Sequence, residues 1–368
     1  MNLSAEDYNE YFVEKMTFNT VFTSLLLLLG LMGNSVVLYF YAFRMPRTED
    51  RYFIPYLAVA DILACAFGSV FSIVINFYRL VFVWENLCKC LYFFTWCTSG
   101  LSAAMLLVIA INRYLKVCRP NGVQMAGKKR VGALLIVFVL SILTTLPLLF
   151  FMGQVNGYVV YNERRVNVTT CGLMTERNDG AAKLYFFIEF SLSLIIMICT
   201  VALYVPIGIS IYKRFRSIRN SKRIRILLGI TTSEVSEDAV SDSSTEARRV
   251  SSPQYKETLQ QVLDTSVCQR KNSRRRRVRH NFTSMFVTIV LFYVLSYVPT
   301  FVLIIIPSKD PFGFWYSLDD ASLNVLVILK RAFIVNHVVN PFVYGYFDLH
   351  FRTIFKSSLS ICKKPSSL

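Results

Sequence analysis

The stretch Asn340-Pro341-Phe342-Val343-Tyr344 lies near the end of the last long apolar run of this 368-residue chain. A proline inside a helix removes one backbone hydrogen bond and clashes with the preceding turn. In a bilayer such a defect persists only where neighbouring helices or ordered water bond to the freed carbonyl. Asn340, with Asn336 one turn earlier, adds polar groups at membrane depth, where they are costly and usually functional. The stretch therefore predicts a transmembrane helix with a polar function.

Long apolar runs accompany this stretch along the whole chain. The chain is 54% hydrophobic and 17% charged, with a mean hydropathy of +0.46, whereas soluble proteins carry about 25% charged residues. Seven runs are long enough to cross about 30 Å of hydrocarbon at about 1.5 Å per residue. The sequence therefore predicts an all-α membrane protein built as a bundle of seven transmembrane helices. The predicted spans lie near 18–44, 51–79, 86–118, 127–151, 183–215, 279–306 and 320–345.

Lysine and arginine gather in alternate loops. If the N-terminus is extracellular, the inner segments hold 30 of the 40 basic and 10 of the 23 acidic residues, an inner charge of +20. The remaining 10 basic and 13 acidic residues sum to −3. This asymmetry follows the positive-inside rule and predicts a multi-pass plasma-membrane protein with its N-terminus outside. The net charge of +17 then needs no nucleic-acid partner.

The segments outside the spans differ in character. Residues 1–17 are acidic, which argues against a cleavable signal peptide and predicts an extracellular tail. The loop from 152 to 182 alternates apolar and polar residues and predicts a β-hairpin over the extracellular mouth. The third inner loop, about 217–277, is rich in Ser, Thr and charge and predicts disorder. We expect a receptor domain over 18–346 and a cytoplasmic tail over 347–368.

Two kinds of modification are predicted outside the membrane. The tripeptides that begin at Asn2 and Asn167 predict N-glycosylation. Cys88, at the top of the third span, and Cys171, in the hairpin loop, lie where an oxidising exterior permits a disulfide. Cys90 competes as the partner of Cys171, so this pairing stays open. The nine cysteines and three histidines have no metal-binding spacing.

Asp61 is the acidic residue of the second span, where a bare carboxylate costs about 2.5–3.5 kcal/mol. Ser102, Asn336 and Asn340 are the polar partners at similar depth. A carboxylate with hydroxyl and amide oxygens forms a hard oxygen site, which suits a small cation such as Na⁺. The alternative is a hydrogen-bonded structural network without an ion. No other cofactor is predicted.

Charges also lie in the outer halves of two later spans. Glu189 is in the fifth span, and Lys330 and Arg331 are in the seventh. Charges at such depth face a cavity and pair. Either Glu189 pairs with Lys330 or Arg331, or these groups meet charges of a ligand. In the sixth span Tyr297 precedes Pro299, whose kink is a pivot for helix motion unless the rings simply fill the core.

Taken together, these motifs resemble the rhodopsin-like (class A) G-protein-coupled receptors, over residues 18–362. After the last span, Phe351, Arg352, Phe355 and Cys362 are similar to the family's short amphipathic eighth helix with its palmitoylation cysteine. Each motif is weak or moderate alone, but their order along the spans makes the resemblance specific. The other matching landmarks are Gly33-Asn34, Leu57 to Asp61, Cys88, Arg113-Tyr114, Pro147, Pro299 and Asn340 to Tyr344.

The resemblance implies an extracellular ligand site between the helices and a cytoplasmic cleft for a heterotrimeric G protein. Asp61, Ser102, Asn336 and Asn340 would form the sodium pocket. Tyr297 would lie at the floor of the ligand site. Arrestin, receptor kinases and membrane lipid are the further partners implied. The residues implied in coupling and switching are Asn112, Arg113, Tyr114, Tyr204, Pro299, Pro341 and Tyr344.

Several positions depart from the family pattern. Asn112 replaces the acid before the arginine, and Arg279 stands where the sixth span usually offers an acid. Both ionic restraints on Arg113 are therefore expected to be missing, which predicts raised ligand-independent signalling. The usual tryptophan of span four is absent, and Tyr293 and Tyr297 replace the usual Phe and Trp of span six. The chain is thus a divergent member.

The ligand is predicted mainly by exclusion. Thr95 stands where amine receptors place an aspartate, and Ile334 where opsins place the retinal lysine, with Lys330 one turn too early. The hairpin loop, the acidic N-terminus and the aromatic walls resemble peptide receptors, so a neuropeptide-like ligand is expected, with a small chemosensory ligand as the alternative. No internal repeat or nucleophile–base pair supports a transporter or an enzyme. The expected ligand contacts are Thr95, Glu189, Tyr297, Thr300, Lys330 and Ile334.

Overall fold

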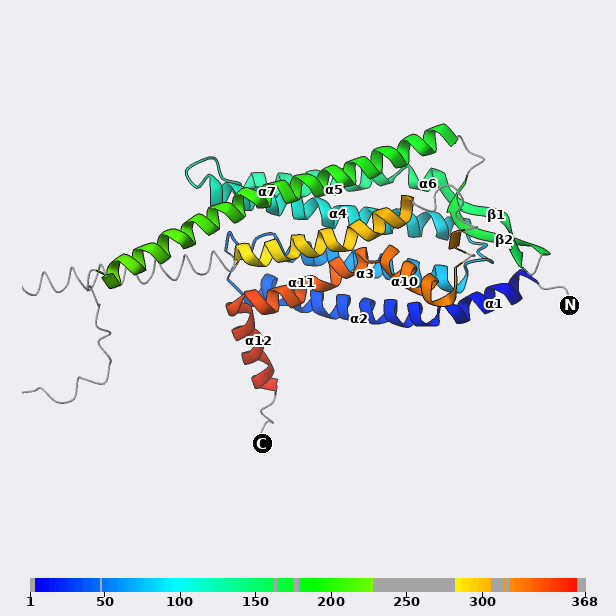
Figure 1. Ribbon diagram of the computed structural model, residues 1–368, viewed down its shortest axis with the longest axis horizontal. Helices are drawn as coiled ribbons and strands as arrows, with labels where there is room; N and C mark the ends of the chain where they lie inside the picture. The colour runs from blue at the N-terminus through cyan, green and yellow to red at the C-terminus, as the bar shows by residue number, and fades with distance from the viewer. Residues whose placement is uncertain are drawn as a thin grey trace, which may run out of the picture.

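The structure, a computed structural model, describes residues 4–46, 48–161, 164–174, 179–227, 282–305, 314–315 and 318–362. Its helices lie side by side in one elongated bundle (Figure 1). Within these ranges, six helices are long and apolar enough to cross a membrane, and a bent pair makes a seventh span. The six are Thr17–Arg44, Ile54–Phe77, Glu85–Cys118, Lys128–Phe151, Gly180–Ser210 and Phe282–Ile305. The predicted all-α bundle of seven spans is confirmed.

Some spans consist of more than one element. The first comprises α2 (Thr17–Tyr39) and a π-helical turn, η1 (Phe40–Arg44). The fourth comprises α5 (Lys128–Thr145) and α6 (Leu148–Phe151). The others are continuous over their apolar residues: α3 (Ile54–Phe77), α4 (Glu85–Cys118), α7 (Asp179–Leu227) and the helix Phe282–Ile305.

The seventh span is bent by 61° between α10 (Asp320–Lys330) and α11 (Phe333–Phe347). The break falls at Arg331 and Ala332 and not at Pro341. Pro341 lies inside α11, which continues past it. At the break, the side chain of Arg331 is held by Asn19 and Asn76 of other helices, at 3.0 and 2.8 Å.

The defect that Pro341 makes is repaired by the first span. Because Pro341 has no N–H, the carbonyl of His337, four residues earlier, loses its helical donor. The Asn34 Nδ2 group donates to this carbonyl at 2.8 Å. Close approach is possible because residue 33 is glycine: a Cβ there would lie 2.9 Å from Pro341 Cγ. Gly33 thus makes room for Pro341, and Asn34 supplies the hydrogen bond that Pro341 removes.

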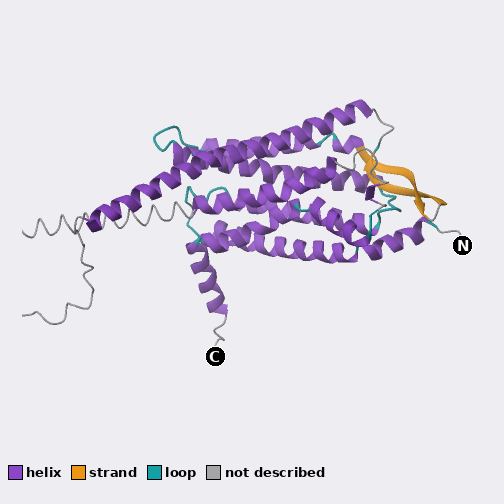
Figure 2. Ribbon diagram, in the orientation of Figure 1, coloured by secondary structure: helices purple, strands orange, loops and turns teal. Residues whose placement is uncertain are grey.

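One end of the bundle carries a β-hairpin and is called the hairpin end here. Strands β1 (Met152–Tyr161) and β2 (Arg164–Leu173) pair antiparallel, which confirms the predicted hairpin (Figure 2). The loop before α4 joins β2, because Phe82 N–H donates to the Thr169 carbonyl at 2.8 Å and Thr169 N–H donates to the Leu80 carbonyl at 2.9 Å. The hairpin is therefore anchored to the bundle.

The predicted tail 1–17 contains a helix, α1 (Ala5–Lys15), in line with α2 (Figure 1). Ser4 and Asp7 cap its first turn reciprocally, and these hydrogen bonds lower the pKa of Asp7. The Asn9 side chain donates to the Phe77 carbonyl at 2.8 Å and accepts from Leu80 N–H at 3.0 Å. The tail is thus packed structure rather than free chain, because it can bond to the exposed end of α3.

The opposite end carries α12 (Leu349–Cys362) and is called the α12 end. α12 runs across the end of the bundle rather than along it (Figure 1), as expected for the amphipathic eighth helix. α7 projects beyond the bundle there and extends to Leu227. The prediction of disorder from 217 is wrong as far as Leu227, because no Gly or Pro interrupts that stretch before Gly229; the rest of the predicted loop, up to 277, lies outside the described residues.

Candidate functional site: a cavity at the hairpin end and two polar clusters

A cavity of about 130 Å³ lies among the helices of the third, fifth, sixth and seventh spans. Four of the six expected ligand contacts line it. Lys330 and Ile334 are not in its lining: Lys330 Nζ lies 4.9 Å from the centre of the Trp315 ring, and Ile334 packs with Cys65 and Val338. The four expected contacts that line the cavity are Thr95, Glu189, Tyr297 and Thr300.

Glu189 is the acidic group of this cavity. Its side chain is 8% exposed. Neither of the two pairings that the sequence suggested is formed, because Arg331 binds Asn19 and Asn76 while Lys330 stacks on Trp315. The alternative in which Glu189 pairs with one of these cations is wrong within the described chain.

The cavity walls are aromatic and their hydroxyl groups are not all satisfied. Tyr297 contacts Tyr293 and Phe301, with ring centres 4.8 and 5.9 Å apart. The hydroxyls of Tyr297 and Ser99 are buried beside each other, and neither has another hydrogen-bond partner among the described residues. The hydroxyls of Thr95 and Thr300 donate to the backbone carbonyls of Phe67 and Ser296, respectively.

Asp61 forms the centre of a polar cluster midway along the bundle. The Ser102 hydroxyl donates to Asp61 Oδ1 at 2.7 Å, and Asn340 Nδ2 donates to Oδ2 at 2.6 Å. His337 Nδ1 lies 2.9 Å from Oδ1. All four side chains are buried, which agrees with the cost of leaving a carboxylate unpaired in lipid.

His337, rather than Asn336, is the third partner of Asp61. Both residues lie within one turn of Asn340, so spacing along the sequence does not distinguish them. Asn336 is buried, and both its amide atoms lack a partner in the described chain, as does Asn340 Oδ1. Buried oxygen acceptors that receive no hydrogen bond and lie beside a carboxylate suit a hard cation. The residues present therefore fit a sodium ion, whose binding stays a prediction.

Tyr344 and Tyr204 are buried, and their hydroxyls have no hydrogen-bond partner within the described ranges. These hydroxyls are therefore available for contacts in a second conformation.

Arg113 lies at the α12 end and is held by an acid from another loop. Arg113 Nη1 donates to Asp50 Oδ1 at 2.9 Å, and Arg113 Nη2 donates to the Asp50 carbonyl. Lys116 Nζ lies 3.2 Å from Asp50 Oδ1. Burial alone would raise the pKa of Asp50, but the charges of Arg113 and Lys116 hold it below its ordinary value, so this carboxylate is charged at neutral pH.

Asp50 is an ionic restraint on Arg113 that the sequence did not predict. Of the two restraints expected to be missing, the one beside Arg113 is absent, and the other position, Arg279, lies outside the described residues. Asn112, beside Arg113, is buried and supplies no charge, but Asp50 of the loop between α2 and α3 supplies one. The guanidinium also lies 4.7 Å from the ring centre of Phe286 in the helix Phe282–Ile305. Nothing in the spacing from Asp50 to Arg113 predicts this pair, because it depends on how the loop folds over α4. Tyr114 is half-buried beside it.

Asp348 is a further polar centre that the sequence reasoning missed. Arg51 binds both its oxygens, each at 3.1 Å, and the Tyr41 hydroxyl donates to Oδ2 at 2.9 Å. Its Oδ1 also accepts the N–H groups of His350 and Phe351, which caps α12. An Asp directly before an amphipathic run is a capping signal that the sequence did contain.

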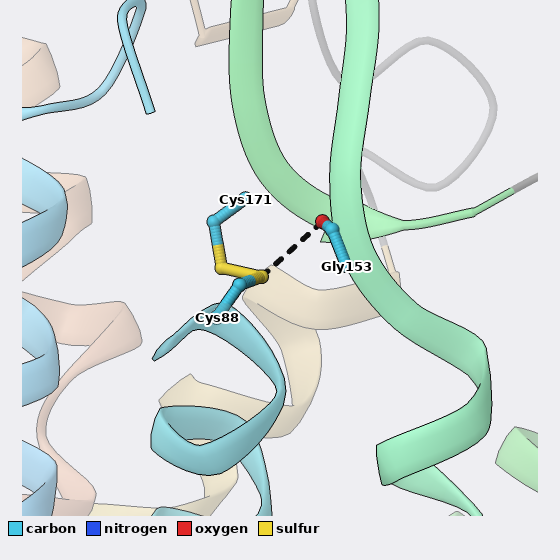
Figure 3. Close-up of a disulfide and its surroundings, with 3 residues drawn as sticks. All are labelled: Cys88, Gly153 and Cys171. Atoms are coloured by element: carbon cyan, nitrogen blue, oxygen red, sulfur yellow. Dashed lines mark hydrogen bonds between the residues drawn. A yellow bond between two sulfur atoms is a disulfide. The ribbon is translucent and has the colours of Figure 1, made fainter. Parts of the chain in front are cut away.

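The disulfide joins Cys88 to Cys171, while Cys90 is free. This settles the pairing that the sequence left open. The bond fastens β2 to the first turn of α4, with the Gly153 carbonyl 3.2 Å from Cys88 Sγ (Figure 3). The hairpin is therefore held above the helices that line the cavity.

Comparison with known families agrees with this geometry. The family described as 7 transmembrane receptor (rhodopsin family) matches residues 33–344, which is most of the chain. The chain belongs to this family. The receptor is accordingly a multi-pass protein of the plasma membrane.

Relatives of this receptor include peptide receptors. The neuropeptide receptor npr-1 of Caenorhabditis elegans is 25% identical over 344 residues, covering 89% of this chain and 69% of that protein. The human cholecystokinin receptor type A is 22% identical, covering 93% and 80%. The thyrotropin-releasing hormone receptor of Ovis aries is 23% identical, covering 92% and 76%.

The remaining predicted site residues are modification sites and helix prolines. Pro299 lies within the helix Phe282–Ile305. Asn167 is exposed on β2, and Cys362 is the last residue of α12. Asn2 lies outside the described residues. Whether Asn2, Asn167 and Cys362 are modified stays a prediction.

Proposed function

We propose that this receptor binds an extracellular peptide in the cavity at the hairpin end and activates a heterotrimeric G protein at the α12 end. The observation that carries the proposal is the cavity itself. It contains buried polar groups that the described chain does not satisfy, and it lies beneath a hairpin anchored by a disulfide. The names of the relatives, which are receptors for a neuropeptide, cholecystokinin and thyrotropin-releasing hormone, support a peptide as the ligand.

The orientation follows from charge and redox chemistry. The hairpin end is extracellular, because its disulfide forms in an oxidising compartment. The α12 end is cytoplasmic, because the loops there carry the basic excess. Glycans at Asn2 and Asn167 and a palmitoyl group at Cys362 belong to these two sides.

Ligand binding acts on the α12 end through the polar cluster of Asp61. In the resting state Asp50 holds Arg113 at the end of α4, and Lys116 binds the same carboxylate. Movement of the helix Phe282–Ile305 around Pro299 releases Arg113 toward the G protein, and Tyr204 and Tyr344 use their free hydroxyls to support it. Asp61, Ser102 and Asn340 would hold a sodium ion, whose charge neutralises the buried carboxylate. Arrestin and receptor kinases act on the activated cytoplasmic face.

The test is nucleotide exchange. The full chain in lipid nanodiscs is presented with a neuropeptide panel and a panel of purified G proteins. Peptide-stimulated exchange that is lost in Tyr297→Ala supports the proposal. A small chemosensory ligand that acts where peptides fail would support the alternative ligand class, and ion flux without nucleotide exchange would contradict the receptor function.

A further inference from the structure

Glu189 lies in the cavity with its charge uncompensated by the described chain. The residue is 8% exposed and lines the cavity. The cations nearest along the opposite span, Lys330 and Arg331, have other partners. Burying a charge without a partner is costly, so such a group is stable where a partner arrives from outside or where it takes up a proton.

The surroundings of this carboxylate favour a cation. The cavity presents the rings of Trp96, Tyr293, Tyr297 and Phe301, and aromatic faces attract ammonium and guanidinium groups. Two buried hydroxyls on the same cavity, those of Ser99 and Tyr297, lie beside each other, have no other partner in the described chain and can accept hydrogen bonds from a cation. No described lysine or arginine lines the cavity, so an anionic ligand group would meet no opposite charge there.

We infer that this cavity is a binding site for an organic cation, an ammonium or guanidinium group, with Glu189 as its counter-ion. This deepens the proposed function, on which it rests: the group is a basic side chain or the amino terminus of the peptide. The carboxylate supplies the charge, the hydroxyls accept N–H groups, and the aromatic rings cover the apolar remainder of the cation.

The charge preference can be measured without knowing the ligand or the G protein. Ser193 lines the cavity one helical turn after Glu189, so Ser193→Cys places a thiol beside the carboxylate. The full chain in nanodiscs is treated with a methanethiosulfonate that carries either a trimethylammonium or a sulfonate group. Mass spectrometry of the peptides reports the modification rate at this thiol and at the native exposed Cys90 in the same molecules.

The cation-to-anion rate ratio at the Ser193→Cys thiol is expected to exceed that at Cys90 by about tenfold or more, because an uncompensated carboxylate acts at short range. Glu189→Gln should bring the two ratios together, and Glu189→Asp should retain most of the difference. Asp320→Asn, which removes an exposed carboxylate of the hairpin end outside the cavity, is the matched control and should leave the ratio unchanged.

Three results would overturn the inference. The first is an equal ratio at both thiols with Glu189 intact, which needs no variant of Glu189 to fold. The second is a preference that survives Glu189→Gln, and the third is a cavity thiol that neither reagent reaches. The proposed signalling function fails separately, in the nucleotide-exchange assay, so the two failures are distinguishable.

Discussion

The two ends of the bundle treat their charges differently. At the α12 end, Asp50 holds Arg113 and Lys116, and Asp348 holds Arg51. At the hairpin end, the cavity keeps Glu189 without a described partner. A charge that is paired within the protein stabilises one conformation. A buried charge without a partner in the protein favours a ligand that supplies the opposite charge. This difference is why we propose that the α12 end restrains the resting receptor and that the hairpin end receives the ligand.

Removing the disulfide should have the largest effect and should break the hairpin end alone. Cys171→Ser frees a loop with a sequence separation of 83 residues, for which closure entropy is worth about 4.5 kcal/mol. We expect severe loss of surface expression, measured by antibody labelling of intact cells. Cys90→Ser is the matched control, because Cys90 is free. Equal loss in both variants would mean that the bond itself is not what matters.

Removing the Asp348 carboxylate should break the α12 end. Asp348→Ala leaves Arg51 largely buried without its partner and removes the cap of α12, at a cost of about 3–5 kcal/mol. Thermal unfolding of the purified receptor should shift to a clearly lower midpoint. Glu85→Gln, which disrupts an exposed pair with Lys89, should shift it little. Similar midpoints in the two variants would count against a stabilising role for Asp348.

The contact that repairs Pro341 should respond to one added methyl group. Gly33→Ala places a Cβ 2.9 Å from Pro341 Cγ, and overpacking of this kind costs about 1–3 kcal/mol. Gly132→Ala is the matched control, because a Cβ at that helical position meets nothing within 4 Å. The expected result is a lower thermal midpoint for Gly33→Ala and an unchanged or higher one for Gly132→Ala. The reverse order would contradict the packing described.

The smallest effect is expected at the rim of the hairpin end. Lys15 pairs with Asp320, whose side chain is 64% exposed, and such pairs contribute about 0–1 kcal/mol. Lys15→Met should therefore leave the thermal midpoint within about 2 °C. A large decrease in the thermal midpoint would show that this ion pair contributes substantially to the stability of the receptor.

The sequence predicts the spans, the hairpin and Cys171 as a disulfide cysteine, because the signals for these features are local. Apolar runs report membrane crossing, and alternation around Asn162 to Arg165 reports strands. The acidic composition of residues 1–17 does not indicate helix α1, although Ser4 and Asp7 form a capping pair. The charge-rich composition after residue 217 predicts disorder, yet α7 continues to Leu227, because charged residues are compatible with a helix.

The sequence predicted most residues of the polar clusters but not which side chains bind one another. Asp61, Ser102 and Asn340 do meet, whereas Asn336 was expected in the place of His337. The restraints on Arg113 from its own helix and from the sixth span were expected to be missing, and the restraint that the structure shows comes from Asp50, which the sequence did not suggest. Such choices depend on how loops and neighbouring turns pack, which periodicity does not encode.

Basal nucleotide exchange in Asp50→Asn tests most directly whether the α12 end holds the receptor inactive. The wild-type receptor should catalyse little exchange without ligand, and Asp50→Asn should raise it about tenfold, because it removes a charged hydrogen bond worth about 1.5–3 kcal/mol. Asp50→Glu should restore part of the restraint. Equal basal exchange in the wild type and Asp50→Asn, at equal amounts of folded receptor, would contradict the account.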